Sequence, residues 1–153
     1  MDSIPGFFID HAGQRLMLIA ESFERLIGRP LVPGKPNVAE SLWQAPFVIV
    51  AHGTEPDPIF FFGNKRALDL FDISLEAFVA MPSRLSAEEG LRIERARLME
   101  RVARDGYIDD YSGVRISATG RRFHIANATV WNIVDGAALH GHAAVFEDWA
   151  FLD

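Results

Sequence analysis

Residues 58–71 read PIFFFGNKRALDLF and decide the fold of this chain. An apolar run ends at Gly63 and Asn64, after which apolar residues recur at helical spacing. This change of period predicts a buried strand over 59–62 that turns sharply into a short helix over 64–71. The turn places one polar amide, that of Asn64, between two apolar elements. We expect Asn64 either to cap the helix or to face a ligand.

The rest of the chain predicts an α+β domain around this stretch. The apolar run from Pro46 to Ala51 precedes it across a turn at 53–58, so the two runs are predicted to form a hairpin. Helices are predicted over 75–80 and from Ala87 to about Arg104. Three strands follow, at Tyr107 to Ser117, Arg121 to Val134 and His140 to Trp149. This order predicts one five-stranded antiparallel sheet with helices packed on one face, since a parallel sheet needs alternating strands and helices.

Both faces of the predicted sheet are apolar. Strict alternation along the strand from Arg121 to Val134 places one apolar set on one face and a second set on the other. The first set is Phe123, Ile125, Trp131 and Ile133, and the second is Ala126, Ala128, Val130 and Val134. The hairpin strands alternate in the same way, which puts Phe61 and Phe62 on opposite faces. An antiparallel sheet with two apolar faces must be covered on both sides.

An N-terminal amphipathic helix is predicted from Ile9 to Gly28, where apolar residues recur every three or four positions. Prolines over 30–36 make a stiff connector after it. We therefore divide the chain into a flanking helix and connector, residues 1–41, and a main domain, residues 42–153. The internal helices are expected to cover one sheet face. The flanking helix and a second copy of the chain are expected to cover the other, through a homodimer.

Composition restricts the function. The chain of 153 residues fits one domain with a core that needs no disulfide or metal. It has no cysteine, which excludes thiolate metal sites, a cysteine nucleophile and a cysteinyl-flavin. The formal net charge of −6 opposes nonspecific binding to nucleic acid. No segment approaches the roughly 20 apolar residues of a membrane span. We expect a cytoplasmic protein with no nucleic-acid or membrane partner.

Three segments carry a family resemblance. They are WQAPFVIVAHGTEPDPIFFFGNKRALDLF (43–71), MPSRLSAEEGLRIERARL (81–98) and GYIDDYSGVRISATGRRFHIANATVWN (106–132). Together they resemble the MEKHLA domain, in its freestanding bacterial form. MEKHLA domains are related to PAS sensor domains, so the resemblance implies a PAS-like fold and a sensory or regulatory role. It also aligns Asn64 with the polar residue that opens the first inner helix of PAS domains.

Many PAS-like domains enclose a small cavity, and many others are packed solid. We name eight candidate ligand-binding residues: His52, Asn64, Arg84, Tyr111, Arg115, Phe123, Trp131 and Phe146. The aromatic residues of the closing strands either line an apolar cavity or fill the core outright. Arg84 and Arg115 suit a ligand carboxylate, because a guanidinium offers a planar bidentate fork. In the alternative, Arg84 only pairs with a carboxylate such as Asp110.

The histidines and carboxylates form no catalytic or metal constellation in the sequence. His140 and His142 share one strand face, but zinc takes three or four protein ligands. No histidine lies between residues 53 and 123, the region from which a haem-binding PAS domain draws its axial ligand, which disfavours haem. Asp109 and Asp110 point to opposite strand faces, so they do not converge for acid/base catalysis. We expect a solvated strand edge there, or ion pairs with the arginine-rich helix.

The sequence therefore favours a PAS-like sensory or regulatory module that dimerises and binds a small organic ligand. The first alternative is a solid-core interaction module whose outer sheet face binds protein without a ligand. The second alternative is a small α+β enzyme that uses His52 or His124 with Asp109 or Asp110. We expect no enzyme activity and assign no cofactor, because haem, cysteinyl-flavin and zinc are all disfavoured.

Overall fold

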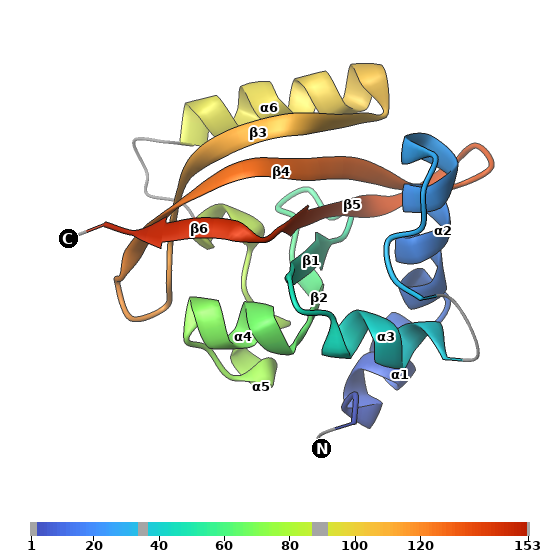
Figure 1. The fold of residues 1–153 in the computed structure, drawn as a ribbon, viewed down its shortest axis with the longest axis horizontal. Coiled ribbons are helices and arrows are strands. Elements are labelled where there is room, and N and C mark those ends of the chain that lie inside the picture. The colour runs from blue at the N-terminus through green and yellow to red at the C-terminus, as the bar shows by residue number, and fades with distance from the viewer. Residues whose placement is uncertain (1–2, 34–36, 87–91, 153) are drawn as a thin grey trace.

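The computed structural model describes residues 3–33, 37–86 and 92–152 (Figure 1). The helices are α1 (Gly6–Ala12), α2 (Arg15–Ile27), α3 (Val38–Gln44), α4 (Lys65–Phe71), α5 (Leu75–Phe78), the 3-10 turn η1 (Ser83–Ser86) and α6 (Arg92–Asp105). The strands are β1 (Val48–His52), β2 (Phe60–Gly63), β3 (Tyr107–Ile116), β4 (Arg122–Asp135), β5 (Ala138–Phe146) and β6 (Asp148–Phe151). The predicted α+β order is confirmed. The predicted start of the long helix at Ala87 lies outside the described residues.

One antiparallel sheet has the strand order β2-β1-β5-β4-β3, and β6 pairs with β4. Its inner face packs against α4, α5, η1 and α6, and α6 runs alongside β3 (Figure 1). Its outer face packs against α1, α2 and α3. Within the described ranges, no helix has the length and apolar character needed to span a bilayer.

Asn64 joins three elements at the turn predicted from residues 58–71. Its side chain is fully buried, and its Oδ1 accepts from the backbone N–H of Ala67 at 3.1 Å, which caps α4. The same oxygen accepts from Ile49 N–H at 3.1 Å. Its Nδ2 donates to the carbonyls of Leu42 at 3.2 Å and Phe47 at 2.8 Å. The capping interpretation is therefore confirmed, and the amide also ties α4 to β1 and to α3.

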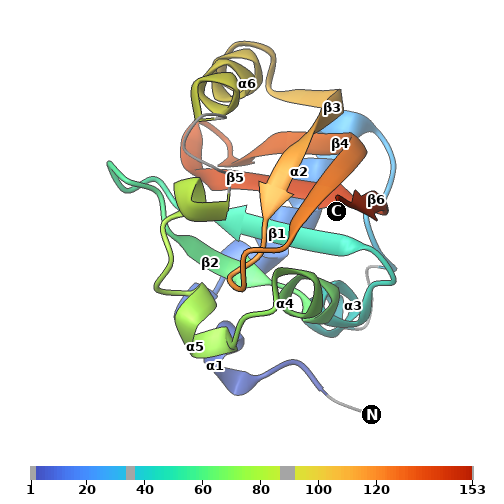
Figure 2. The same ribbon diagram turned by 90° about the vertical axis from the view of Figure 1, so that its left-hand side faces the viewer.

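The N-terminal helices cover the outer face of their own sheet. The single helix predicted from Ile9 to Gly28 is wrong, because Gly13 adopts φ 57° and ψ −130° and separates α1 from α2. Helix α2 then packs on β4, where Phe23 and Trp131 meet edge to face with centroids 4.9 Å apart. The indole N–H of Trp131 donates to the hydroxyl of Ser22 at 3.1 Å. Figure 2 shows α2 on the far side of the strands.

A cation also packs on this outer layer. The guanidinium of Arg15 lies 4.0 Å from the centroid of the Phe61 ring. Burial lowers the pKa of the Arg15 guanidinium, and the charge of Glu55 partly opposes this shift. The arginine thus packs on the outer layer with its guanidinium over an aromatic face.

A β-bulge at Asn127 reverses the alternation of β4. Asn127 has φ 57°, and the pairing with β3 shifts register beside it. Before the bulge, Phe123 packs with Phe71 on the inner face. After the bulge, Trp131 packs with Phe23 on the outer face. The predicted placement of Phe123 and Trp131 on one face is therefore wrong, because one extra residue exchanges the two faces.

Two further departures involve strand continuity. On β2, Phe62 pairs with Ala51 and Phe60 pairs with His52, so Phe61 is an extra residue in the ladder. Phe61 and Phe62 both join the outer cluster, and their predicted separation is wrong. The strand predicted from His140 to Trp149 is also split. Strand β5 ends at Phe146, and β6 pairs with the first half of β4 opposite the Asn127 bulge.

Replacing Asn64 tests its role as the junction of the fold. We expect Asn64→Ala to lower the free energy of unfolding by at least about 3 kcal/mol, because two buried N–H groups and two carbonyls lose their partner. The matched control is Asn37→Ala at the exposed N-cap of α3, where only Glu40 N–H loses a partner and about 1 kcal/mol is expected. Urea unfolding measures both. Equal losses at the two positions would contradict the role given to Asn64.

Candidate functional site

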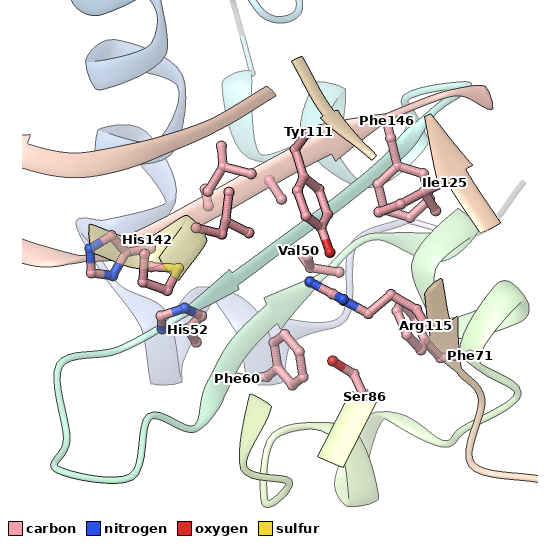
Figure 3. Close-up of a pocket in the computed structure, with 15 residues that line it drawn as sticks. Val50, His52, Phe60, Phe71, Ser86, Tyr111, Arg115, Ile125, His142 and Phe146 are labelled. Atoms are coloured by element: carbon pink, nitrogen blue, oxygen red, sulfur yellow. The ribbon is translucent and has the colours of Figure 1, made fainter. Parts of the chain in front are cut away.

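A cavity of about 60 Å³ lies between the inner sheet face and the layer formed by η1 and α6. Its walls come from β1, β2, β3, β4, β5, α4, η1 and α6. Most of the described lining side chains are apolar. The polar ones are His52, Ser86, Tyr111, Arg115 and His142 (Figure 3). A cavity with an apolar wall and a few polar groups is typical of a small-ligand site.

Strand β3 supplies two polar groups through its alternation. Tyr111, Gly113 and Arg115 share the inner face, since Gly113 pairs with Ile125 and Arg115 pairs with Phe123. A Cβ at Gly113 would collide with the hydroxyl of Tyr111. The glycine therefore gives the phenol room to lie along the strand toward Arg115. The guanidinium carbon of Arg115 lies 5.1 Å from the centroid of the Tyr111 ring.

Arg115 brings a permanent positive charge to the cavity. Figure 3 shows its guanidinium reaching the middle of the pocket, where the Tyr111 hydroxyl points toward it. The side chain is half-buried, and one of its N–H groups donates to the carbonyl of Val114 at 3.1 Å. Among the described residues, no carboxylate forms an ion pair with Arg115. None of the described residues that line the cavity is Asp or Glu.

Two histidines and a serine complete the polar wall. His52 and His142 are paired positions on β1 and β5, and their ring centroids lie 5.2 Å apart. His52 is 7% exposed, and its Nδ1 lies 3.1 Å from the carbonyl oxygen of Gly53. The buried Ser86 hydroxyl donates to the carbonyl of Ser83 at 2.7 Å within η1. The backbone N–H of Ser83 donates to the carbonyl of Pro58 at 2.8 Å, which ties η1 to the segment before β2.

Of the eight predicted site residues, the structure brings His52, Tyr111, Arg115 and Phe146 together around this cavity. Phe123 lies beside it in the core, where its ring packs on Phe71. Asn64 and Trp131 lie away from it. The Asn64 side chain uses its hydrogen bonds to join three elements, and the Trp131 side chain faces α2 on the outer side.

Arg84 also lies outside the cavity. Its Nε lies 3.1 Å from each carboxylate oxygen of Asp57, and both side chains are about half exposed. Pairing of Arg84 with Asp110 was the alternative given from sequence, and the partner is different. Asp110 pairs instead with Arg101 on α6 at 3.1 Å, so the ion pair expected between this strand and the arginine-rich helix is present.

Several lining residues were not among the sequence candidates. Ser86 and His142 provide polar atoms, while Val50, Phe60 and Phe71 provide apolar wall. The signal for His142 was available, because β1 and β5 are neighbours in a PAS-like sheet and His52 is its register partner. The position of η1 over the cavity depends on tertiary packing. No local pattern of residues 83–86 reveals it.

The size of the cavity limits what it holds. One water molecule occupies about 10–15 Å³ of such a cavity. The cavity of about 60 Å³ therefore accommodates roughly four to six non-hydrogen atoms. A flavin or haem ring system is several times larger. Over the described part of the chain, no group of three or more His, Cys, Asp or Glu side chains is placed to hold a metal ion.

Comparison with known proteins agrees with this fold. The MEKHLA domain matches residues 13–151. The chain belongs to the MEKHLA domain family. A homeobox-leucine zipper protein of Oryza sativa subsp. indica, HOX29, is 25% identical over 118 residues, which cover 76% of this chain and 14% of that protein. This MEKHLA domain thus spans about one seventh of the length of that relative.

Solved PAS domains share the architecture of this MEKHLA domain. A PAS domain from Colwellia psychrerythraea is similar with a TM-score of 0.61 and 17% identity, covering 72% of this chain and 92% of that chain. The PAS domain of a LuxR-family transcriptional regulator from Burkholderia thailandensis, solved in complex with ethanol, has a TM-score of 0.57 and 16% identity. The similarity covers 74% of this chain and 97% of the Burkholderia thailandensis chain. These likenesses show that the MEKHLA domain has a PAS-like fold.

The charge of Arg115 has a cost for the ligand-free protein. We expect Arg115→Met to raise the free energy of unfolding by about 1 kcal/mol, because an apolar side chain of similar length replaces a half-buried cation with one hydrogen bond. Arg84→Met is the control, and loss of its exposed pair with Asp57 should cost at most about 1 kcal/mol. Urea unfolding in buffer without organic acids measures both variants. A larger loss for Arg115→Met than for Arg84→Met would contradict this interpretation.

Proposed function

We propose that this MEKHLA domain is a sensory or regulatory module whose inner cavity binds a small organic ligand. The observation that carries the proposal is Arg115, a half-buried cation in an apolar cavity with no acid among its described lining residues. Such a group lowers stability unless a partner is supplied, and a bound ligand is one source of it. A PAS domain of similar fold was solved with ethanol, a molecule of comparable size to this cavity.

Occupancy is proposed to act on the layer that closes the cavity. Helix α6 contributes Leu98 and Met99 to the wall, and η1 contributes Ser86. Both elements pack on the sheet without being strands of it, so a ligand that contacts both sides favours one packing over another. Phe146 offers a second route, because it lines the cavity and meets Trp149 of β6 edge to face with centroids 6.0 Å apart.

We propose no catalytic activity for this chain. The carboxylates named for the enzyme alternative are unsuited to it, because Asp110 is paired with Arg101 and Asp109 is exposed on β3.

The alternative of a ligand-free interaction module has one observation in its favour. The cavity is small enough that ordered water alone would fill it.

We also propose that the domain forms a homodimer through the part of the outer face that α1, α2 and α3 leave open. Val114, His124 and Ala150 occupy one register row there, and Ala126 and Asp148 occupy a neighbouring one. Val114 and Ala126 are half-buried within the single chain. We call these two rows the open strip. In a two-fold symmetric dimer the open strip of one copy packs against the open strip of the other copy. Asp148 at one end of the strip would then approach Arg122 at the opposite end of the partner's strip.

A library of small metabolites tests ligand binding. We expect at least one compound to raise the midpoint of thermal unfolding of the wild-type protein, since a ligand that binds only the folded state stabilises it. Ala144→Leu should abolish the shift, because the larger side chain enters the cavity. Ala138→Leu at the exposed start of β5, away from the cavity and from the open outer face, is the control and should retain it. If no compound gives a shift in the unfolding midpoint that Ala144→Leu removes, the result would favour the interaction module without a ligand.

Light scattering tests the dimer. The wild-type protein is expected to reach the mass of two chains at high concentration, and Ile116→Glu is expected to remain a single chain, because it puts a charge in the open strip beside Val114. Leu139→Glu changes an exposed apolar residue that lies on β5 away from this strip, and it should leave the dimer intact. A wild-type protein that stays a single chain at every concentration would overturn the homodimer.

A further inference from the structure

The charge balance of the cavity selects for an anion. Arg115 is the only permanently charged side chain among the described residues that line it. The acidic side chains nearest in sequence are engaged elsewhere or exposed, since Asp110 pairs with Arg101 on the surface of α6. A cationic ligand would therefore meet one like charge and no counter-charge among the described lining residues. An anionic ligand would supply the counter-charge that Arg115 lacks among these residues.

The chemistry of the guanidinium suits an oxyanion such as a carboxylate. Arg115 has five N–H donors, and its hydrogen bond to the Val114 carbonyl uses one of them. A carboxylate accepts two parallel N–H bonds from one edge of a guanidinium, which makes this pairing short and strong. Figure 3 places the Tyr111 hydroxyl and the Ser86 hydroxyl on either side of this group. A carboxylate has further lone pairs, and the O–H of Tyr111 serves one of them, whereas the single O–H of Ser86 already donates to the Ser83 carbonyl.

The rest of the cavity defines the remainder of the ligand. Val50, Phe60, Ile125 and Phe146 form apolar wall around the guanidinium. A short alkyl chain gains from contact with this wall, whereas a second carboxylate would lose its hydration there. The cavity of about 60 Å³ has space for roughly four to six non-hydrogen atoms, which is the size range from acetate to butyrate.

We propose that the cavity binds a short-chain monocarboxylate, with its carboxylate on the guanidinium of Arg115 and its alkyl chain against the apolar wall. This inference names the ligand class of the proposed sensory function and rests on it. Binding is of moderate strength, because a ligand of about five non-hydrogen atoms reaches micromolar affinity at best. The domain is then suited to reporting a metabolite present at high concentration rather than a trace signal.

Calorimetric titration with sodium propionate at constant ionic strength tests the proposal on the full chain. We expect propionate to bind the wild-type protein and Arg84→Gln equally, because Arg84 is paired with Asp57 outside the cavity. Arg115→Gln should weaken binding at least tenfold. Arg115→Lys, which keeps the charge without the planar fork, should give an intermediate loss. Propionamide has the same shape without the charge and should bind at least tenfold more weakly to the wild-type protein.

Two results would overturn the carboxylate assignment. One is propionate affinity that Arg115→Gln leaves unchanged, with thermal unfolding confirming that the variant is folded. The other is propionamide binding as tightly as propionate. The proposed function survives either result if a neutral compound stabilises the wild-type protein and Ala144→Leu removes the effect. If neither carboxylates nor neutral compounds give an effect that Ala144→Leu removes, the proposed function fails together with this inference.

Discussion

The side-chain amide of Asn64 is the interaction on which the rest of the structure depends. Its four hydrogen bonds join the start of α4, the backbone of β1 and the end of α3 within one buried group. This junction fixes where the β1–β2 hairpin ends and where the inner helical layer begins. The cavity lies between these two parts, so its shape follows from the same junction. Asn64 therefore supports the shape of a cavity that it does not line.

The sequence is sufficient to predict the elements but not the faces of the strands. The period change at Gly63 and Asn64 predicts β2 and α4 because adjacent residues determine it. The face of Phe123 depends on the bulge at Asn127, and the face of Phe62 depends on the extra residue at Phe61. A bulge is set by pairing with a distant strand, so periodicity within one strand does not reveal it. This is why Phe123 and Trp131 were expected in one cavity.

The candidate site divides along the same line. Tyr111 and Arg115 were both named as candidates from the sequence, and both line the cavity, because residues four apart on a regular strand share a face. Ser86 reaches the cavity through the placement of η1, which the backbone hydrogen bond from Ser83 to Pro58 ties to the segment before β2. His142 reaches it through the β1–β5 register, and both are long-range features. Arg84 and Arg115 are chemically alike in the sequence. Only the structure separates them. Arg84 pairs with the carboxylate of Asp57, whereas no carboxylate of the described residues pairs with Arg115.

The two faces of the sheet have different roles in this account. The outer face is largely covered by the chain's own N-terminal helices, and its buried aromatic contacts stabilise the fold. The inner face keeps a small space around one cation. The most direct test is a crystal structure of the protein grown with propionate. We expect electron density for one propionate molecule within hydrogen-bonding distance of the Arg115 guanidinium. A cavity filled by protein side chains, with Arg115 turned to solvent, would contradict it.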